Sequence, residues 1–217
     1  MSGLGAVLFD MDGTLVDTEV LWWETTEEIA AGLGHRLGRA DAPEVVGRAV
    51  ADTAGHLVRV SGRGEPAAVA AGLTEGFFQR VAAGAPMRPG AQALLTALEA
   101  QGLPFALVSA SPRVVVDSVV GGSLAHVPFA FTLSADDTVR TKPHPDPYRE
   151  AAARLGLGPQ ECVAVEDSPD GAASAEAAGC PVLVVPSLLE VPPSDARTFA
   201  GSLEEVTPDV LRGCLVL

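Results

Sequence analysis

The apolar positions of this chain follow two different patterns, and the change between them divides the sequence. Residues 6–9 form an apolar run that is too short for a helix and typical of a buried strand. Residues 15–84 then place apolar side chains mostly at helical spacing. From residue 86 onward, short apolar runs alternate with helical stretches. This alternation predicts an α/β fold, in which helices cover both faces of a parallel sheet.

Capping and turn residues set the expected boundaries of the elements. Within the helical segment we expect a helix over 15–34 with Asp17 or Thr18 as N-cap, two short helices in 42–62, and a helix from Pro66. Later helices are predicted before Gly102 and over 112–120, 148–155 with Asp146 as N-cap, 169–178 and 207–211. Strands are predicted over 4–10, 104–108, 129–133, 162–165 and 182–185.

The first predicted strand stands apart from the others and needs partners, so it must join their sheet. Residues 15–85 then form an all-helical domain that is inserted into an α/β domain made of residues 1–14 and 86–217. The two connections between these domains are expected to lie close in space. The Pro-rich tail after residue 186 carries little further pattern.

Composition narrows the class of protein. The chain has 217 residues and a formal net charge of −14 without a cluster of Lys or Arg, which disfavours nucleic acids and anionic membranes as partners. Its three cysteines have no paired spacing and are expected to be reduced, buried thiols. No basic leader precedes the first apolar run, and no apolar run approaches the length of a membrane span. We therefore expect a cytoplasmic monomer.

Two carboxylates stand directly behind the first predicted strand, in Asp10-Met11-Asp12-Gly13-Thr14. Gly13 allows the chain to turn sharply there. In open α/β sheets, ligands bind at this carboxyl end of the strands. Two turn-forming Asp residues would be the purely structural interpretation. The whole motif behind an apolar strand instead favours two carboxylates that address different atoms of one substrate.

Polar residues follow other predicted strands as well. Ser109 comes after one of them, and Glu166 and Asp167 come after another. Thirteen of the 14 basic residues are Arg, and the only Lys, Lys142, lies in a Pro-rich loop behind a further strand. The ends of parallel strands share one edge of the sheet, where so many acids facing one Lys would repel each other without a cation. Hard oxygen ligands of this kind point to Mg²⁺.

Two helix starts have both a functional and a structural interpretation. Ser109-Ala110-Ser111-Pro112 opens a helix, so its hydroxyl and free N–H groups form an anion site, and Ser111 is also expected to cap the helix. Ser168 is expected to cap the helix that follows Glu166 and Asp167. A cap needs only one acceptor, so capping does not explain those two acids.

In this order, and with a helical insertion after the first, these motifs resemble the haloacid dehalogenase superfamily of phosphatases with an α-helical cap. The residues that carry the resemblance are Asp10-Met11-Asp12-Gly13-Thr14, Ser109, Lys142-Pro143 and Glu166-Asp167-Ser168. The resemblance runs to about residue 185 and favours the sugar-phosphate phosphatases. It implies a Rossmann-like core and an inserted cap that closes as a lid over the leaving group.

The resemblance also implies roles for the acids. Asp10 would attack phosphorus and form an aspartyl-phosphate, while Asp12 would protonate the leaving alcohol and then activate water. The implied Mg²⁺ would be held by the Asp10 carboxylate, the Asp12 carbonyl, Asp167 and, directly or through water, Glu166.

The resemblance also implies which residues bind the phosphoryl oxygens and the rest of the substrate. The phosphoryl oxygens would be held by Ser109, the Ala110 N–H and Lys142. The further substrate contacts that we expect are Thr14, Ser111 and Arg48. The candidates for contact with the leaving group are Arg48, His56, Trp22 and Arg113, although packing or surface charge explains each of them equally well.

Other activities of this superfamily fit the sequence less well. Dehalogenation has no alcohol to protonate and would not need Asp12 or the metal cluster. A phosphomutase of the β-phosphoglucomutase type carries a His where this chain has Trp22, and its cap Arg follows a Gly by three, whereas Arg48 follows Gly47 directly. Both departures favour hydrolysis. A phosphometabolite-binding module without turnover is the other alternative, and the intact motif residues disfavour it.

Overall fold

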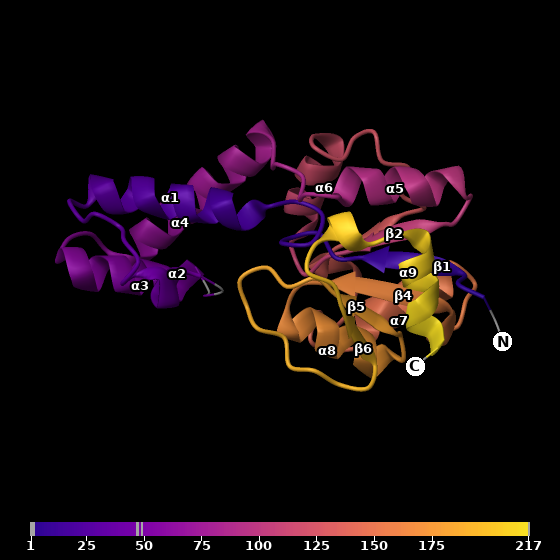
Figure 1. Ribbon diagram of the computed structural model, residues 1–217. Coiled ribbons are helices and arrows are strands. Elements are labelled where there is room, and N and C mark those ends of the chain that lie inside the picture. The colour runs from indigo at the N-terminus through magenta and orange to yellow at the C-terminus, as the bar shows by residue number, and fades with distance from the viewer. Residues whose placement is uncertain (1–2, 47, 49, 217) are drawn as a thin grey trace. The chain divides into compact units, whose positions relative to one another are not determined.

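The computed structural model describes residues 3–46, 48 and 50–216, which divide into two compact units (Figure 1). An α/β unit runs to Asp17 and resumes at Pro86, and a helical unit spans Thr18–Ala85. Residues 15–17, which the sequence pattern assigned to the helical insertion, therefore belong with the α/β unit. Among the described residues, no helix is both long enough and apolar enough to cross a membrane.

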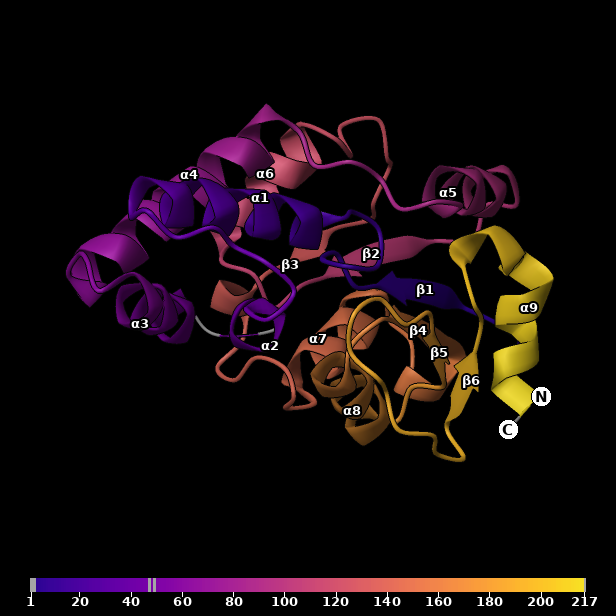
Figure 2. The ribbon, with the colours of Figure 1, turned by 60° about the vertical axis from the view of Figure 1, so that its left-hand side comes forward.

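The α/β unit is built on a six-stranded sheet in the order β3-β2-β1-β4-β5-β6, in which all neighbouring strands are parallel (Figure 2). The strands are β1 (Ala6–Phe9), β2 (Phe105–Val108), β3 (Thr132–Leu133), β4 (Cys162–Glu166), β5 (Val182–Val184) and β6 (Arg197–Phe199). Every residue of β1, β2, β4 and β5 is buried, which explains their continuous apolar runs. β1 lies in the middle, paired with β2 and β4.

Helices cover both faces of this sheet, as the alternating pattern predicted. Figure 1 shows α5 (Ala91–Ala100) and α6 (Arg113–Gly121) over one face, with α7 (Asp146–Arg154) and α8 (Pro169–Ala178) over the other. A final helix, α9 (Pro208–Gly213), contacts α5. The faces of α7 and α8 that meet the sheet are rich in Ala, which lets both helices approach the strands closely.

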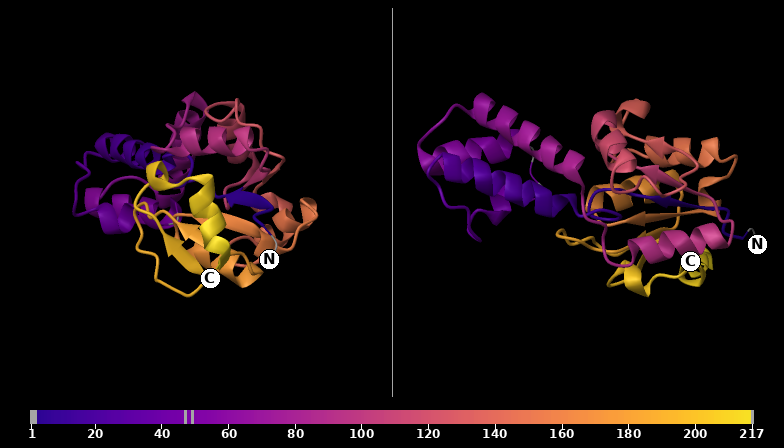
Figure 3. Two further views of the ribbon diagram at one scale, coloured as in Figure 1. Left: turned by 45° about the vertical axis from the view of Figure 1, so that its right-hand side comes forward. Right: turned by 90° about the horizontal axis from the view of Figure 1, so that it is seen from above.

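The helical unit consists of α1 (Thr18–Gly32), α2 (Ala42–Val45), α3 (Val50–Ser61) and α4 (Pro66–Ala83). α4 packs against both α1 and α3 (Figure 3). The indole of Trp22 donates a hydrogen bond from Nε1 to the Val45 carbonyl (2.9 Å) and meets the Phe77 ring edge-on. Trp22 and Trp23 both pack against the core of this unit, so packing accounts for them.

The two segments that lead to the helical unit are tied to each other within the α/β unit. Residues 13–15 form a turn, and Val16 then bridges to Met87 in antiparallel fashion. The Asp17 N–H donates to the Pro86 carbonyl (2.8 Å), and the Arg88 N–H donates to the Leu15 carbonyl (2.9 Å). These contacts keep residues 15–17 out of the helix, which is why α1 begins at Thr18 and not at residue 15.

Three further boundaries differ from the sequence prediction. β3 contains only Thr132–Leu133 of the expected 129–133, and β6 lies in the tail where no strand was expected. Asp146 is the first residue of α7, and the N-cap residue is Pro145. The Asp146 carboxylate does not cap the helix but accepts hydrogen bonds from Arg140 Nε and Nη2 (3.0 Å each).

The three cysteines are free and buried. Burial raises the pKa of Cys162 to about 11 and that of Cys180 to about 12, so both thiols stay protonated at neutral pH.

Candidate active site

Asp10 follows β1 and faces the only lysine of the chain. Lys142 Nζ donates hydrogen bonds to Asp10 Oδ1 and to Glu166 Oε1, at 2.6 Å each, and its side chain is only 4% exposed. Burial alone would lower the pKa of Lys142, but the Asp10 and Glu166 carboxylates raise it above its ordinary value. Asp10 Oδ2 is buried and has no hydrogen-bond partner among the described residues. One oxygen of this carboxylate is thus held, and the other is left for a ligand.

Glu166, the last residue of β4, is completely buried and surrounded by donors. Its Oε1 accepts hydrogen bonds from Lys142 Nζ and from the Tyr148 hydroxyl, and Oε2 accepts one from Ser168 Oγ (3.3 Å). Burial raises the pKa of Glu166, although the Lys142 ammonium acts in the opposite direction. Gly171 makes room for this carboxylate, because any side chain at that position would collide with it.

Asp167 lies next to the turn behind β1. Its Oδ2 accepts a hydrogen bond from the Ser187 hydroxyl and stands where a side chain at position 13 would be. Gly13 is therefore required both for this close approach and for its backbone φ of 82°.

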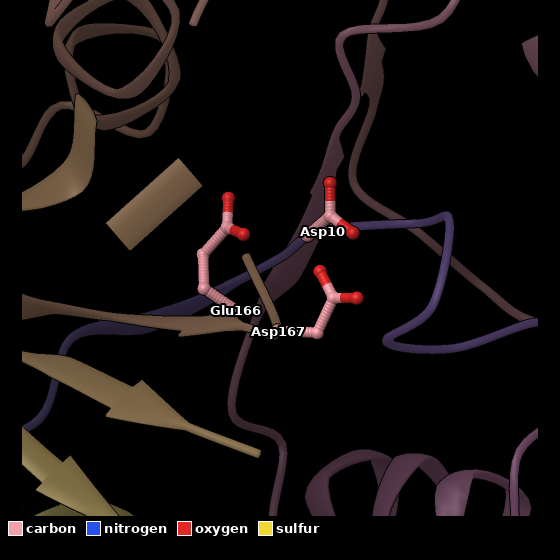
Figure 4. Close-up of side chains that lie close together, drawn as sticks. All are labelled: Asp10, Glu166 and Asp167. Carbon is pink, nitrogen blue, oxygen red and sulfur yellow. The ribbon is translucent and has the colours of Figure 1, made fainter. Parts of the chain in front are cut away.

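Asp10, Glu166 and Asp167 converge at the carboxyl edge of the sheet. Each offers a carboxylate oxygen, and these three oxygens lie within 4.8 Å of one another (Figure 4). A buried group of three carboxylates, whose negative charge exceeds what the Lys142 ammonium neutralises, fits a hard divalent cation such as Mg²⁺. The Asp12 carboxylate is not part of this group, and the sequence prediction assigned only its carbonyl to the metal.

Asp12 instead contacts the loop after β2. Ser111 Oγ donates a hydrogen bond to Asp12 Oδ2 (2.7 Å), and Ser109 Oγ lies 3.3 Å from the same oxygen. Ser109 Oγ also accepts a hydrogen bond from the Ser111 N–H (2.9 Å). The structure thus brings the two predicted serines to the second of the two predicted acids.

The expectation that Ser111 caps α6 is wrong. The residue before this helix is Pro112, and no side chain of the N-cap residue makes a capping bond. The Arg113 N–H at the start of α6 donates instead to Asp136 Oδ2 (2.7 Å). Because a residue from another segment satisfies the helix end, the Ser111 hydroxyl remains available for Asp12. The Ser168 prediction is confirmed, since its Oγ accepts a hydrogen bond from the Gly171 N–H (3.1 Å).

The other expected substrate contacts differ in their surroundings. Thr14 is buried next to Gly13, and its hydroxyl has no partner within the described part of the chain. Ala110 is exposed between the two serines. Arg48 belongs to the helical unit, where it is exposed and donates from Nε to the Pro43 carbonyl (2.9 Å). The spacing between Gly47 and Arg48 distinguished this sequence from the phosphomutases, and Gly47 lies outside the described residues.

Two of the suggested leaving-group contacts have structural partners. His56 is buried in the helical unit with Nε2 at 2.7 Å from Asp41 Oδ1. The Arg113 guanidinium binds Asp137, Asp117 and the hydroxyl and carbonyl of Thr132. Both residues are thereby accounted for by packing and charge pairing.

Two residues of the site were missed by sequence reasoning. Tyr148, whose hydroxyl donates to Glu166, could have been found from the sequence. It is the only tyrosine of the chain and directly follows the Pro-rich loop that carries Lys142. Ser187 lies in the tail after β5, where no pattern marks it.

Comparison with known proteins adds independent findings to this geometry. The family model of the haloacid dehalogenase-like hydrolases matches residues 4–179. Hexitol phosphatase A of Escherichia coli K12 is 35% identical over 213 residues, which cover 92% of each chain.

Two solved structures have similar folds. A haloacid dehalogenase family hydrolase of Deinococcus radiodurans with bound phosphate and sodium is 27% identical at a TM-score of 0.81, covering 99% of this chain and 98% of that chain. CbbY of Rhodobacter sphaeroides in complex with xylulose-1,5-bisphosphate is 25% identical at a TM-score of 0.68, covering 93% of this chain and 96% of that chain.

Proposed function

Because this chain belongs to the haloacid dehalogenase-like hydrolases and is a phosphoric monoester hydrolase of that family, we propose that it cleaves a small sugar phosphate through phosphorylation of Asp10. The observation that carries the proposal is the difference between the contacts of the two Asp10 carboxylate oxygens. Lys142 holds Oδ1, while the buried Oδ2 has no partner among the described residues. A carboxylate oxygen that accepts no hydrogen bond, on a side chain held in place through its other oxygen, is suited to act as a nucleophile.

In the first step, Asp10 Oδ2 forms a bond to phosphorus as the bond from phosphorus to the leaving oxygen breaks. Asp12 gives its proton to that oxygen, so the sugar leaves as a neutral alcohol. In the second step, Asp12 takes a proton from water, the water oxygen bonds to phosphorus, and the bond to Asp10 breaks. Inorganic phosphate is released, and both acids return to their initial states.

The phosphoryl group carries negative charge throughout, and this acidic protein must supply local positive charge for it. Lys142 supplies a charged ammonium at the nucleophile, while the Ser109 hydroxyl and the Ala110 N–H supply donors at the neighbouring loop. Thr14, whose buried hydroxyl has no partner among the described residues, is a further substrate contact in this proposal.

The proposal includes Mg²⁺ as the cofactor. The Asp10 carboxylate, the Asp12 carbonyl and Asp167 would hold it, with Glu166 through water, because Lys142, Tyr148 and Ser168 already occupy the Glu166 oxygens. When bound, Mg²⁺ neutralises phosphoryl oxygens and so lowers the barrier to attack by an anion.

The substrate class rests on the relatives. One relative is named a hexitol phosphatase, and another structure holds a ketose bisphosphate, so phosphate esters of sugars and sugar alcohols are the class to test. The helical unit is the lid in this proposal, with Arg48 as its expected substrate contact. The monomeric state and the cytoplasmic location stay predictions.

The test is phosphate release from a panel of sugar phosphates, hexitol phosphates, nucleotides and phosphoglycolate, with and without Mg²⁺. A parallel assay measures transfer of phosphate between positions 1 and 6 of a glucose phosphate. Mg²⁺-dependent release from one sugar or hexitol phosphate supports the proposal and names the substrate. Transfer without release would make the protein a mutase, and no turnover of any ester would leave only a binding role.

A further inference from the structure

Tyr148 touches both members of the ion pair that faces the nucleophile. It lies on α7 with no exposed surface, and its hydroxyl donates to Glu166 Oε1. The same oxygen accepts the hydrogen bond from Lys142 Nζ (2.6 Å). In addition, Lys142 Nζ stands 5.3 Å from the centre of the Tyr148 ring. The phenol therefore adjoins the lysine through its ring and the glutamate through its hydroxyl.

We propose that Tyr148 is a positioning residue, whose hydroxyl fixes Glu166 so that Glu166 in turn holds the Lys142 ammonium against Asp10. This inference rests on the proposed function, in which Lys142 must stand beside the phosphoryl group. Lysine has a flexible stem and a small charged end, so its place is set by the acceptors around it. Asp10 fixes Nζ from one side and Glu166 from the other.

The contacts of Glu166 explain why the hydroxyl matters. Oε2 has a single long hydrogen bond, to Ser168 Oγ at 3.3 Å, whereas Oε1 has two donors. Without the phenol, the only short hydrogen bond to the Glu166 carboxylate from the described residues would be the one from Lys142. Glu166 and Lys142 could then shift together, and the Lys142 ammonium would no longer be held in place beside the Asp10 carboxylate.

Packing alone does not account for a tyrosine at this position. Tyr148 belongs to an apolar cluster of strand residues and helix alanines, which a phenylalanine ring would fill equally well. Burying a hydroxyl costs free energy unless it finds an acceptor, and here the acceptor is the charged residue that holds the lysine. Burial and the nearby carboxylates raise the pKa of Tyr148 well above its ordinary value, so it stays a donor.

The test compares Tyr148→Phe with a matched control, Ser174→Ala. Phenylalanine keeps the ring and removes only the hydroxyl. Ser174 is a buried residue of α8 whose hydroxyl donates to the His144 carbonyl, in the same loop that carries Lys142. Within the described part of the chain, this hydroxyl makes no hydrogen bond to Lys142 or Glu166. Both variants lose one buried hydrogen bond near this loop, and thermal unfolding measures what each loss costs in stability.

Two readouts separate positioning from simple stabilisation. The first is kcat and KM with p-nitrophenyl phosphate and Mg²⁺. The second needs no activity: Lys142 is the only lysine, so acylation by an N-hydroxysuccinimide ester, followed by mass spectrometry, reports on Lys142 and on the α-amino group alone. We expect Tyr148→Phe to lower kcat about 10-fold to 100-fold with little change in KM, and to speed Lys142 acylation about tenfold.

The proposal requires both changes in Tyr148→Phe and neither in Ser174→Ala. Wild-type values of kcat or of the acylation rate in Tyr148→Phe would overturn it, as would equal changes in both variants. If the wild-type protein hydrolyses no phosphate ester, the proposed function fails, and the acylation rates alone then decide whether Tyr148 holds the lysine in place.

Discussion

Ser111 donates its hydroxyl proton to Asp12 Oδ2 across 2.7 Å, which fixes one oxygen of that carboxylate as an acceptor. As long as Ser111 donates this hydrogen bond, the proton that Asp12 carries as a general acid sits on the other oxygen, Oδ1. The hydrogen bond thus assigns separate tasks to the two oxygens of a general acid.

Replacing Asp12 with alanine should cost activity according to the leaving group. An alkyl alcohol leaves poorly without a proton, so we expect Asp12→Ala to lower kcat/KM, which reports on the first step, by about 10²- to 10⁴-fold for a sugar phosphate. The loss of kcat/KM on p-nitrophenyl phosphate should be much smaller, because a nitrophenolate leaves without help, whereas kcat should fall for both esters because Asp12 also activates water in the second step. Steady-state kinetics on both esters measure this, and equal losses of kcat/KM would contradict the acid role.

Removing the Ser111 hydroxyl should matter only through Asp12. We expect Ser111→Ala to lower kcat about tenfold on a sugar phosphate, because the proton of Asp12 is then no longer confined to one oxygen. In the Asp12→Ala background the same change should have little effect, so the double-mutant cycle reports strong coupling. Additive losses would show instead that Ser111 acts on the substrate directly.

Asp10→Asn should abolish turnover while the protein stays folded. The amide keeps the size of the side chain but cannot attack phosphorus. In the wild-type protein, acid quenching during turnover followed by mass spectrometry should locate a phosphoryl group on Asp10, which is absent from the variant. Circular dichroism provides the control for folding, and substantial residual activity would disprove the nucleophile assignment.

The buried Asp41 of the helical unit should make that unit sensitive to acid. Burial would raise the pKa of Asp41, but hydrogen bonds from His56, the Gly38 N–H and His35 hold it below its ordinary value. Such a carboxylate adds stability above its unfolded pKa of about 3.9, and this contribution is lost as the pH falls through the lower, folded-state pKa.

Asp41→Asn should accordingly lower the free energy of unfolding by about 1–3 kcal/mol near pH 7, and the difference from wild type should shrink below about pH 4. Urea unfolding followed by tryptophan fluorescence measures the helical unit specifically, because both tryptophans lie in it. Asp52→Asn, at an exposed position of α3, is the control. A difference that is independent of pH would contradict the assignment.

The elements that sequence reasoning found share a strong local signal. β1, β2, β4 and β5 are fully buried, so each appears as an uninterrupted apolar run, and this pattern was sufficient to predict the parallel sheet. β6 gives no such signal, because Arg197–Phe199 is an edge strand whose residues are half-buried or exposed. The acids and Lys142 were found because they are charged residues at the ends of the predicted strands.

The residues that were missed or misassigned depend on contacts that are distant in sequence. Local capping rules favour Ser111 for α6, yet Asp136 reaches that helix end from the segment after β3. Tyr148 and Ser187 act on Glu166 and Asp167 through hydroxyls that no periodicity reveals. Their partners became apparent only once β4, α7 and the loop after β5 were placed together.

The central place of β1 also has a consequence for biosynthesis. β1, which directly precedes Asp10, pairs with β2 and with β4, whose residues 162–166 leave the ribosome long after β1 does. Until then, this apolar strand has no complete set of neighbours, while all the residues of the helical unit have already been made. Nascent chains that stop before β4 would therefore expose an apolar strand to chaperones and would lack Glu166 and Asp167, so the catalytic centre cannot assemble until β4 has been made.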